Sequence, residues 1–309
     1  MMEKVLITPR SYGKYDKSVE DQLKNAGFAV VGNPVGRILT KEEMKTWIAD
    51  CVGVIIGVDP LDKDVLACAP NLRAVSKYGV GTDNIDLDYC KEHGVEVTIT
   101  RGANSQAVAD YAFSMLCACA RKIPAIDKYC HAQDWTKRMG LDIYGKKIGI
   151  LGLGAIGKGV AERAAGFHME VLAYDVYWNE DYAAQHGIRY AKPEEIFREC
   201  DFISLHLPLT EQTHGIVNEA ALSQMKKTAV LINTARGELI DEDALVKALQ
   251  SGQIAAAGLD VFREEPPKNP ELYQLENLIM GAHCAASTQG ASMAMSQMAT
   301  ENLVRALVR

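Results

Sequence analysis

The chain has 309 residues, and its 33 basic and 40 acidic side chains give a formal net charge of −7. It contains no block of basic residues, which argues against nucleic acid or an anionic membrane as its main partner. With 48% hydrophobic and 24% charged residues, it has the composition of an ordinary globular protein, long enough for two domains. An anionic substrate therefore has to be captured by a local basic pocket.

Cysteine usage and the apolar runs bear on the compartment. The eight cysteines form no C-x-x-C pair, and their number is too small for a disulfide scaffold in a chain of this length. The first apolar run reaches Pro9 and Arg10 too early for a signal peptide. No apolar run approaches the roughly 18 residues that span a bilayer. The sequence therefore predicts a cytoplasmic protein with reduced thiols.

The first hundred residues alternate short apolar runs with amphipathic segments. Gly27 suits the end of a first helix, and Thr40 opens a second one with capping-box spacing. The runs are rich in valine and isoleucine and do not alternate with polar residues, as expected when helices cover both faces of a parallel sheet. The expected strands are Val5–Ile7, Phe28–Val31, Val52–Ile56, Arg73–Ser76 and Val95–Ile99.

A long run of small and apolar residues follows, from Ser105 to His131. It has few helix breakers before Pro124, so it is expected to form one helix that links a first domain to a second.

A second series of strands and helices begins at Lys147. Asp241–Gln250 is expected to be a helix, and the amphipathic tail Ala291–Arg309 is expected to return to the first domain. The pattern predicts an α/β protein with two doubly wound parallel-sheet domains. The predicted domains are residues 1–101 with 285–309, and residues 102–284. The expected strands are Lys147–Leu151, Val171–Tyr174, Phe202–Leu205, Val230–Ile232, Ala256–Leu259 and Leu278–Met280.

Three glycines with G-x-G-x-x-G spacing, Gly152, Gly154 and Gly157, follow the first strand of this second series. They precede an alanine-rich helix. In this spacing the first glycine permits a tight turn, the second permits close approach to a pyrophosphate, and the third permits close packing of helix on strand. The helix start, with Ala155 and Ile156, then offers free N–H groups and the positive end of the helix dipole to the phosphates. This context predicts a dinucleotide site.

Asp175 ends the next strand, 18 residues after Gly157, close to the spacing of about 20 in such sites. A carboxylate there accepts hydrogen bonds from the ribose hydroxyls of NAD and repels the additional phosphate of NADP, so NAD is the predicted cofactor. The alternative is a glycine-rich turn followed by an unrelated surface aspartate.

Arg236 follows Asn233-Thr234-Ala235 at the carboxyl end of a strand, the end of an open α/β sheet at which ligands bind. An arginine there is suited to bidentate binding of a carboxylate. The alternative interpretation is an ion pair between the domains.

His283 also follows a strand, and Glu265 precedes it by 18 residues. An imidazole titrates near neutral pH and can deliver and retrieve a proton. A carboxylate on its distal nitrogen would orient the ring and favour its protonated form. Taken alone, the histidine is more simply a core residue and Glu265 a solvated loop charge, and Glu264 competes for the carboxylate role.

His206 and Pro208 follow another strand and suggest one wall of the cofactor pocket. His214 lies eight residues beyond His206, across the proline, and no pair of carboxylates accompanies them. No metal site is therefore expected.

These motifs, in this order, resemble those of the D-isomer-specific 2-hydroxyacid dehydrogenases over nearly the whole chain. The resemblance implies a Rossmann NAD domain and a flavodoxin-like substrate domain. The segments that carry it are Gly152–Gly157, His206–Thr210, Asn233–Leu239, Gly258–Phe262, Glu265-Pro266, His283 and the loop Tyr78–Asp86.

The resemblance also implies roles. Arg236 would hold the substrate carboxylate and carbonyl, and Glu265 with His283 would form the acid–base pair. Tyr78, Gly79 and Val80 would meet the substrate carboxylate, partly through backbone N–H groups. The expected cofactor contacts are Gly152, Gly154, Ala155, Ile156, Gly157, Asp175, His206, Pro208, Thr213, Ala235 and Asp260, the last on the nicotinamide amide.

Within the family, the chain most resembles short 3-phosphoglycerate dehydrogenases, so 3-phosphoglycerate is the expected substrate, with Arg10 and Lys77 as candidate phosphate contacts. Hydroxypyruvate, glyoxylate and lactate-type acids are the alternatives, and a non-catalytic NAD-sensing corepressor is a further one. A homodimer built on the long helix is also implied. At two places the chain departs from the pattern. The turn Gly57-Val58-Asp59 has no arginine, although 3-phosphoglycerate dehydrogenases often place a phosphate contact there, and Gly281-Ala282 replaces the usual Thr-Pro or Ser-Pro before the histidine.

Overall fold

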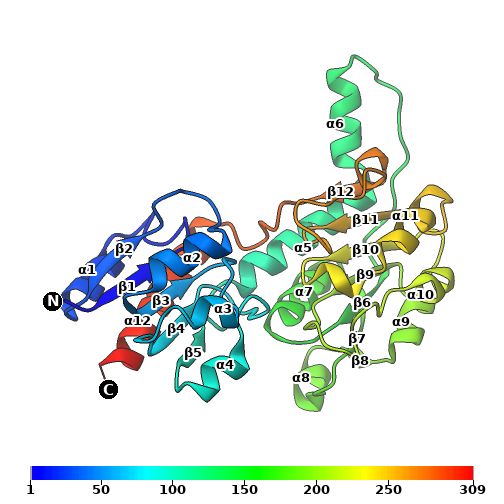
Figure 1. Cartoon of the computed structure of the whole chain (residues 1–309). Helices are drawn as coiled ribbons and strands as arrows, with labels where there is room; N and C mark the ends of the chain where they lie inside the picture. Colours follow the sequence, from blue (N-terminus) through cyan, green and yellow to red (C-terminus); the bar gives the residue numbers. More distant parts are fainter. Residues whose placement is uncertain (1, 309) are drawn as a thin grey trace. The chain divides into compact units, whose positions relative to one another are not determined.

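The computed structural model describes residues 2–308 and divides them between two compact units (Figure 1). Unit 1 is Met1–Asn104 with Ser287–Arg309, and unit 2 is Ser105–Ala286. The divisions therefore follow residues 104 and 286, where the sequence predicted 101 and 284.

Unit 1 contains a five-stranded sheet in the order β2-β1-β3-β4-β5, in which every neighbouring pair is parallel. The strands are β1 (Lys4–Ile7), β2 (Ala29–Gly32), β3 (Cys51–Ile56), β4 (Ala74–Lys77) and β5 (Glu96–Ile99). The helices are α1 (Ser18–Asn25), α2 (Lys41–Ile48), α3 (Lys63–Leu66), α4 (Leu87–Glu92) and α12 (Gln289–Leu307).

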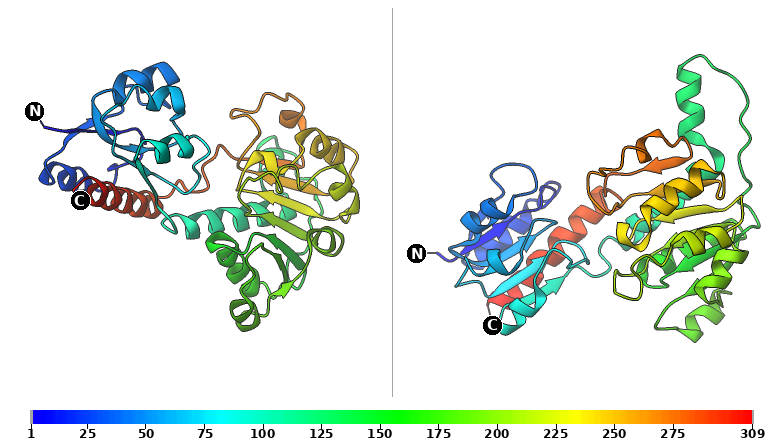
Figure 2. Two further views of the ribbon diagram at one scale, coloured as in Figure 1. Left: turned by 60° about the horizontal axis from the view of Figure 1, so that its bottom comes forward. Right: turned by 45° about the vertical axis from the view of Figure 1, so that its right-hand side comes forward.

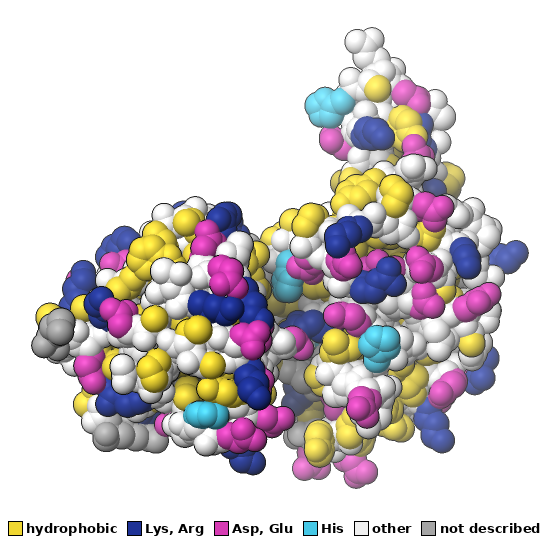
Figure 3. Space-filling view, viewed as in Figure 1, with side chains coloured by type: hydrophobic (Ala, Val, Ile, Leu, Met, Phe, Trp, Pro, Cys, Tyr) yellow, Lys and Arg dark blue, Asp and Glu magenta, His cyan; other side chains and the backbone are white. Residues whose placement is uncertain are grey.

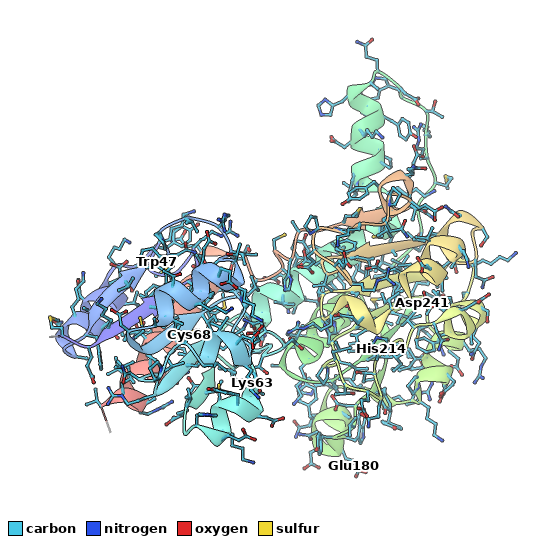
Figure 4. All side chains as sticks on the ribbon, viewed as in Figure 1. Trp47, Lys63, Cys68, Glu180, His214 and Asp241 are labelled. Atoms are coloured by element: carbon cyan, nitrogen blue, oxygen red, sulfur yellow. The ribbon has the colours of Figure 1, made fainter. Side chains whose placement is uncertain are left out.

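Helix α12, from the far end of the chain, packs on the sheet of unit 1 because its buried side chains complete one of the two cores. Leu303 and Leu307 lie over Gly53, where a Cβ atom would come within 3.0 Å of each. Met44 and Ile48 of α2 belong to the core on the other face, and Trp47, labelled in Figure 4, packs partly buried against it.

Unit 2 contains a seven-stranded parallel sheet in the order β12-β11-β10-β9-β6-β7-β8. Figure 2 shows helices on both of its faces, where they bury two separate cores. The predicted fold class, two doubly wound parallel α/β domains, is confirmed. The strands are β6 (Lys147–Leu151), β7 (Glu170–Tyr174), β8 (Arg189–Tyr190), β9 (Phe202–Leu205), β10 (Val230–Asn233), β11 (Ala256–Leu259) and β12 (Leu278–Met280).

Strand β8 was not predicted, because two residues are too short a run for any periodicity. The helices of unit 2 are α5 (Ser105–Arg121), α6 (Ile123–His131), α7 (Ala155–Gly166), α8 (Glu180–Gln185), α9 (Pro193–Glu199), α10 (Glu219–Gln224) and α11 (Glu242–Gln250), with short 3₁₀ turns η1 (Gly237–Leu239) and η2 (Leu272–Gln274).

The prediction of one helix from Ser105 to His131 was wrong. Lys122 has φ 55° and separates α5 from α6. Pro124 is the physical reason, because it has no N–H for the carbonyl of Ala120 four residues earlier, and its ring collides with that carbonyl in a continuous helix. The Ala120 carbonyl accepts instead from the N–H of Leu141, at 2.8 Å.

Two further observations concern the molecular surface. Among residues 2–308, no helix combines the length and the apolar character needed to cross a membrane. On the face drawn in Figure 3, basic and acidic side chains are interspersed over each unit, in keeping with the absence of a basic block from the sequence.

Candidate active site

The glycine loop between β6 and α7 has the backbone geometry that the fingerprint predicts. Gly152 has φ +101°, a conformation that favours glycine. A Cβ atom there would also lie 2.6 Å from the carbonyl carbon and oxygen of His206. At Gly157 a Cβ atom would collide with the carbonyl oxygen of Gly152. Both positions thus require glycine, so that loop, helix and neighbouring strand can pack closely.

Gly154 differs from these two glycines because a Cβ atom there would meet nothing within 4 Å. It is the N-cap of the 12-residue helix α7, and the exposed Ala155 and the half-buried Ile156 open the first turn. The N–H groups of that turn have no partner within the helix. Open space in front of free amides and a positive dipole end suits a pyrophosphate, so the loop fits the predicted cofactor.

Asp175 lies at the rim of this loop, directly after β7. Its Oδ2 accepts the N–H of Leu153 at 2.6 Å, and its Oδ1 accepts the N–H of Tyr177 at 3.0 Å. The half-buried carboxylate is therefore held beside the glycine loop. The following residues, Val176 and Tyr177, are exposed and uncharged, so they offer no cation to a ribose phosphate.

His206 follows β9 beside the loop. Its Nε2 is 2.8 Å from the Ser204 hydroxyl, and its buried Nδ1 has no partner within residues 2–308. Burial lowers the pKa of His206 to about 4, so the ring is neutral at physiological pH. Pro208 is exposed, whereas the hydroxyl of Thr213 is buried and donates to the Pro208 carbonyl at 2.6 Å. Thr213 therefore stabilises this turn.

Arg236 is held at the end of β10 by Asn233, which is fully buried. The Asn233 amide donates to the carbonyl of Arg236 at 2.8 Å and accepts the N–H of Ala235 at 3.0 Å. The guanidinium of Arg236 donates to the Ala235 carbonyl at 2.6 Å. A Cβ atom at Gly237 would collide with the main chain of Phe262. The turn after β10 is thus fixed by side chain and by packing, which orients Arg236.

His283 and Glu265 form a hydrogen-bonded pair. Nδ1 of His283 lies 2.8 Å from Oε2 of Glu265, and Oε1 of Glu265 accepts the N–H of Phe262 at 3.2 Å. The side chains are 44% and 37% exposed, respectively. Glu264, the competing carboxylate, pairs with Lys268 at 2.6 Å instead. The geometry therefore pairs the histidine through Nδ1 with Glu265 and not with Glu264.

The surroundings of Glu265 favour its ionised form. Burial on its own raises the pKa of Glu265, but the hydrogen bond and charge of His283, the Phe262 N–H and the charge of Arg236 together outweigh it, and its pKa lies below the ordinary value. The carboxylate is thus available to accept a hydrogen bond from Nδ1–H of His283. The charge of Arg236 acts on the same carboxylate, so the three predicted catalytic residues share one electrostatic environment.

Asp260, at the end of β11, organises the segment that carries His283. Its carboxylate is 1% exposed and accepts the N–H groups of Cys284 at 3.0 Å and Ala285 at 2.8 Å. Its main-chain carbonyl accepts the N–H of His283 at 2.8 Å. His283 has φ 52°, unusual for a residue with a side chain, so these bonds hold the histidine in a conformation that costs energy.

The expected substrate residues lie in unit 1. The ammonium of Lys77 is buried and donates to the Gly57 carbonyl and, at 2.8 Å, to the side chain of Asn84. The hydroxyl of Tyr78 bonds to Ser292 of α12, and its N–H donates to the Ile56 carbonyl. These contacts hold both side chains within unit 1.

The backbone of the same loop is partly committed as well. The N–H of Gly79 donates to the Thr100 hydroxyl at 2.8 Å. The next residue, Val80, and Arg10, after β1, are both exposed. Of the N–H groups expected to meet a carboxylate, those of Tyr78 and Gly79 are therefore used inside the unit, and the expectation falls on Val80.

No group of three or more histidine, cysteine, aspartate or glutamate side chains among residues 2–308 is arranged to hold a metal ion. His214, labelled in Figure 4, is exposed in the turn after β9. The candidate site therefore consists of the glycine loop Gly152–Gly157, Arg236 and the pair of His283 and Glu265.

Comparisons with known proteins identify the family. The family model described as D-isomer specific 2-hydroxyacid dehydrogenase, NAD binding domain, matches residues 113–285. A glyoxylate reductase of Korarchaeum cryptofilum (strain OPF8) is 42% identical over 265 residues, which are 83% of this chain and 80% of that protein. The chain belongs to the D-isomer-specific 2-hydroxyacid dehydrogenase family. It is an oxidoreductase that acts on a CH–OH group and uses NAD.

Other relatives of this dehydrogenase extend the comparison. A D-3-phosphoglycerate dehydrogenase of Rattus norvegicus is 38% identical over 94% of this chain, which is 54% of that protein. The crystal structure of the TT0316 protein from Thermus thermophilus matches with TM-score 0.90 and 34% identity, over 99% of this chain and 97% of that one. D-lactate dehydrogenase from Aquifex aeolicus, in complex with NAD and lactic acid, matches with TM-score 0.86 and 29% identity, over 98% and 95%.

The sequence predicted no role for Asn233, although this residue opens the segment Asn233–Leu239. An asparagine at the end of a strand is a signal for a side-chain-stabilised turn. The sequence also predicted no role for Tyr111 of α5, because no local pattern distinguishes this residue from the apolar residues around it.

Proposed function

We propose that the dehydrogenase reduces a small 2-oxo acid, glyoxylate or hydroxypyruvate, to the corresponding 2-hydroxy acid with NADH. The observation that carries the choice of substrate is its 42% identity to a glyoxylate reductase over most of both chains. The buried contacts of Lys77 agree with it, because an ammonium that donates to Gly57 and Asn84 is poorly placed to bind a substrate phosphate. This proposal replaces the expectation of 3-phosphoglycerate.

The second candidate, 3-phosphohydroxypyruvate, is supported by the 38% identity to the rat 3-phosphoglycerate dehydrogenase. Arg10 is exposed directly after β1 and is the remaining cation proposed for a phosphate. The two candidates differ by a single charged group, so they are separated by one comparison of substrates.

In the proposed reaction, the glycine loop and Asp175 would hold NADH, which would supply the hydride for the carbonyl carbon of the substrate. Arg236 holds the carboxylate and the carbonyl oxygen through its planar guanidinium, and this interaction strengthens as negative charge develops on that oxygen. His283 donates a proton to the oxygen from Nε2, because Nδ1 is occupied by Glu265. Glu265 orients the ring and stabilises its protonated form before transfer. In the oxidation direction, His283 retrieves the proton.

The substrate prediction concerns the parent enzyme. With NADH, kcat/KM for glyoxylate or hydroxypyruvate should exceed that for 3-phosphohydroxypyruvate by about 10-fold or more. A phosphate that enters the site without a cation to bind it gives up at least one charged hydrogen bond to water. Steady-state kinetics on the three acids and pyruvate make the comparison. A preference for the phosphorylated acid that disappears in Arg10→Ala, with glyoxylate unaffected, would establish the second candidate instead.

The cofactor prediction concerns Asp175. The parent enzyme should prefer NADH to NADPH, and Asp175→Asn should reduce this preference by roughly 10- to 100-fold, the effect of one or two charged hydrogen bonds. Asparagine keeps an oxygen for the N–H of Leu153 in the glycine loop and gives up only the bond from the N–H of Tyr177, which lies outside that loop. Glu180→Gln, at the start of α8 (Figure 4), is a control on an exposed carboxylate of the same unit. An unchanged ratio in Asp175→Asn would show that this carboxylate does not reach the ribose.

We also propose a homodimer, but through α6 in place of the continuous helix first expected. More than half of α5 is buried inside unit 2, whereas α6 buries no residue and projects from that unit (Figure 1). The helix and the segment after it expose Ile123 (55%), Trp135 (81%) and Met139 (85%). Large apolar side chains exposed on a projecting segment are suited to a protein interface.

Light scattering at micromolar concentration should therefore show a dimer, and Trp135→Glu should weaken it by placing a charge in an apolar contact. Tyr177→Glu, at an exposed aromatic residue after β7, is the control and should leave the dimer intact. A monomeric parent enzyme would contradict the proposal.

A further inference from the structure

A tyrosine of α5 lies at the centre of the segment that carries His283. The thiol of Cys284 donates to the hydroxyl of Tyr111 at 3.4 Å and lies 3.6 Å from Oδ1 of Asp260. The Tyr111 hydroxyl and Oδ1 of Asp260 also lie against the same point, the position that a Cβ atom of Gly281 would occupy. Tyr111 thus reaches the two residues that flank His283 in space, although it is more than 140 positions away from them along the chain.

Gly281 explains why the hydroxyl can be there. A Cβ atom at this position would lie 2.6 Å from the oxygen of Tyr111 and would collide with Oδ1 of Asp260. The hydroxyl of Tyr111 occupies the space that a side chain at position 281 would need. This explains why the chain has glycine there, where the family pattern has threonine or serine.

The environment keeps Tyr111 a hydrogen-bond donor. Burial, the Cys284 thiol and the charge of Asp260 all raise the pKa of Tyr111 well above its ordinary value, so the phenol stays protonated. Asp260 is almost fully buried, and a buried carboxylate is costly unless its oxygens accept hydrogen bonds. The donors to Asp260 include two backbone N–H groups and the Cys284 thiol, which also contacts the phenol, so Tyr111 lies next to the groups that satisfy this carboxylate.

We propose that Tyr111 is a positioning residue of the active site, whose hydroxyl fixes the Asp260 carboxylate and through it the main chain that presents His283. Asp260 bonds to the N–H groups of His283, Cys284 and Ala285 through its main-chain carbonyl and its side chain. A carboxylate free to rotate would release that strained segment. The inference rests on the proposed function in so far as Asp260 serves the nicotinamide and His283 serves the substrate.

The test is Tyr111→Phe, which removes one oxygen and keeps the ring in the core. We expect kcat to fall by about 10-fold and the Kd for NADH to rise by a similar factor, as for the loss of one hydrogen bond to a charged group. The KM for glyoxylate should change little, because Arg236 is held independently by Asn233. Tyr129→Phe is the matched control, since its hydroxyl donates to another carboxylate of unit 2, Glu276, at 2.6 Å.

A double-mutant cycle shows whether Tyr111 acts through Asp260. In an Asp260→Asn background, Tyr111→Phe should have almost no further effect on kcat or on NADH binding. An equal factor in both backgrounds would overturn the proposal, and so would Tyr111→Phe with the kcat and Kd of the parent and only a lower Tm. Gly281→Ala is a second variant, and its expected loss of kcat should be smaller when Tyr111→Phe has removed the hydroxyl.

NADH binding separates this inference from the function on which it rests. If the parent enzyme reduced no 2-oxo acid, the proposed function would fail, and fluorescence titration of NADH with the parent and Tyr111→Phe would still decide the role of Tyr111. If the parent is active and Tyr111→Phe equals it in kcat and Kd, only the inference about Tyr111 fails.

Discussion

Replacement of His283 by asparagine should lower kcat for 2-oxo acid reduction by about 10²-fold or more, the usual contribution of general acid–base catalysis. Asparagine cannot transfer a proton at neutral pH, yet it tolerates the left-handed backbone of this position, where φ is 52°. The loss should appear in kcat, because the proton is needed during the reaction and not to bind the substrate. Stopped-flow or steady-state measurement of NADH oxidation at saturating substrate provides the value.

The chain offers a matched control for this variant. His168 is exposed and also has φ 52°, so His168→Asn makes the same change in the same backbone conformation without touching the site. It should retain parent kinetics. Glu265→Gln should lower kcat by a smaller factor than His283→Asn, since the acid remains and only its orientation and charge stabilisation are lost. Near-normal turnover in His283→Asn would move the acid role to another residue.

The second large effect is expected at Arg236. Arg236→Lys keeps the positive charge but loses the planar pair of donors, so kcat/KM should fall by on the order of 10²-fold, as for one or two charged hydrogen bonds. Both KM and kcat should change, because the guanidinium binds the carboxylate in the ground state and the developing oxyanion in the transition state. Binding of NADH, measured by fluorescence, should stay near the parent value.

Arg198→Lys, on the exposed side of α9, controls for the general effect of an arginine-to-lysine change in unit 2. An unchanged KM for glyoxylate in Arg236→Lys would count against carboxylate binding by this residue. A large loss of NADH affinity would indicate that the turn after β10, held by Asn233, had been disturbed instead.

The catalytic assignments depend to different degrees on local pattern. The glycine loop could be predicted because the spacing of its glycines reflects where the backbone leaves no room for a side chain. The structure shows this lack of room at Gly152 and Gly157. The partner of His283 could not be chosen from sequence, since Glu264 and Glu265 are adjacent and equally charged. The turn that ends with Phe262 decides the choice, because its N–H binds Glu265 and leaves Glu264 to Lys268.

For the long helical run, the sequence made a definite prediction that was wrong. The composition from Ser105 to His131 favours a single helix at every position except Pro124. Because proline cannot donate the backbone hydrogen bond of a continuous helix, α5 and α6 are separate helices. The consequence reaches beyond secondary structure. The break separates α5, whose apolar residues are buried in unit 2, from α6, whose apolar residues are exposed, and so relocates the proposed dimer surface.

The sequence by itself predicted the parallel α/β architecture, the dinucleotide loop, and Arg236 and His283 as candidate site residues, because strand periodicity, glycine spacing and motif order are all visible along the chain. Only the tertiary structure decided how buried polar groups are satisfied. It committed Lys77 to Gly57 and Asn84, and placed Tyr111 against Gly281 and Asp260. These contacts join residues from different elements, and a buried donor or acceptor selects its partner by proximity in space, which no local pattern encodes.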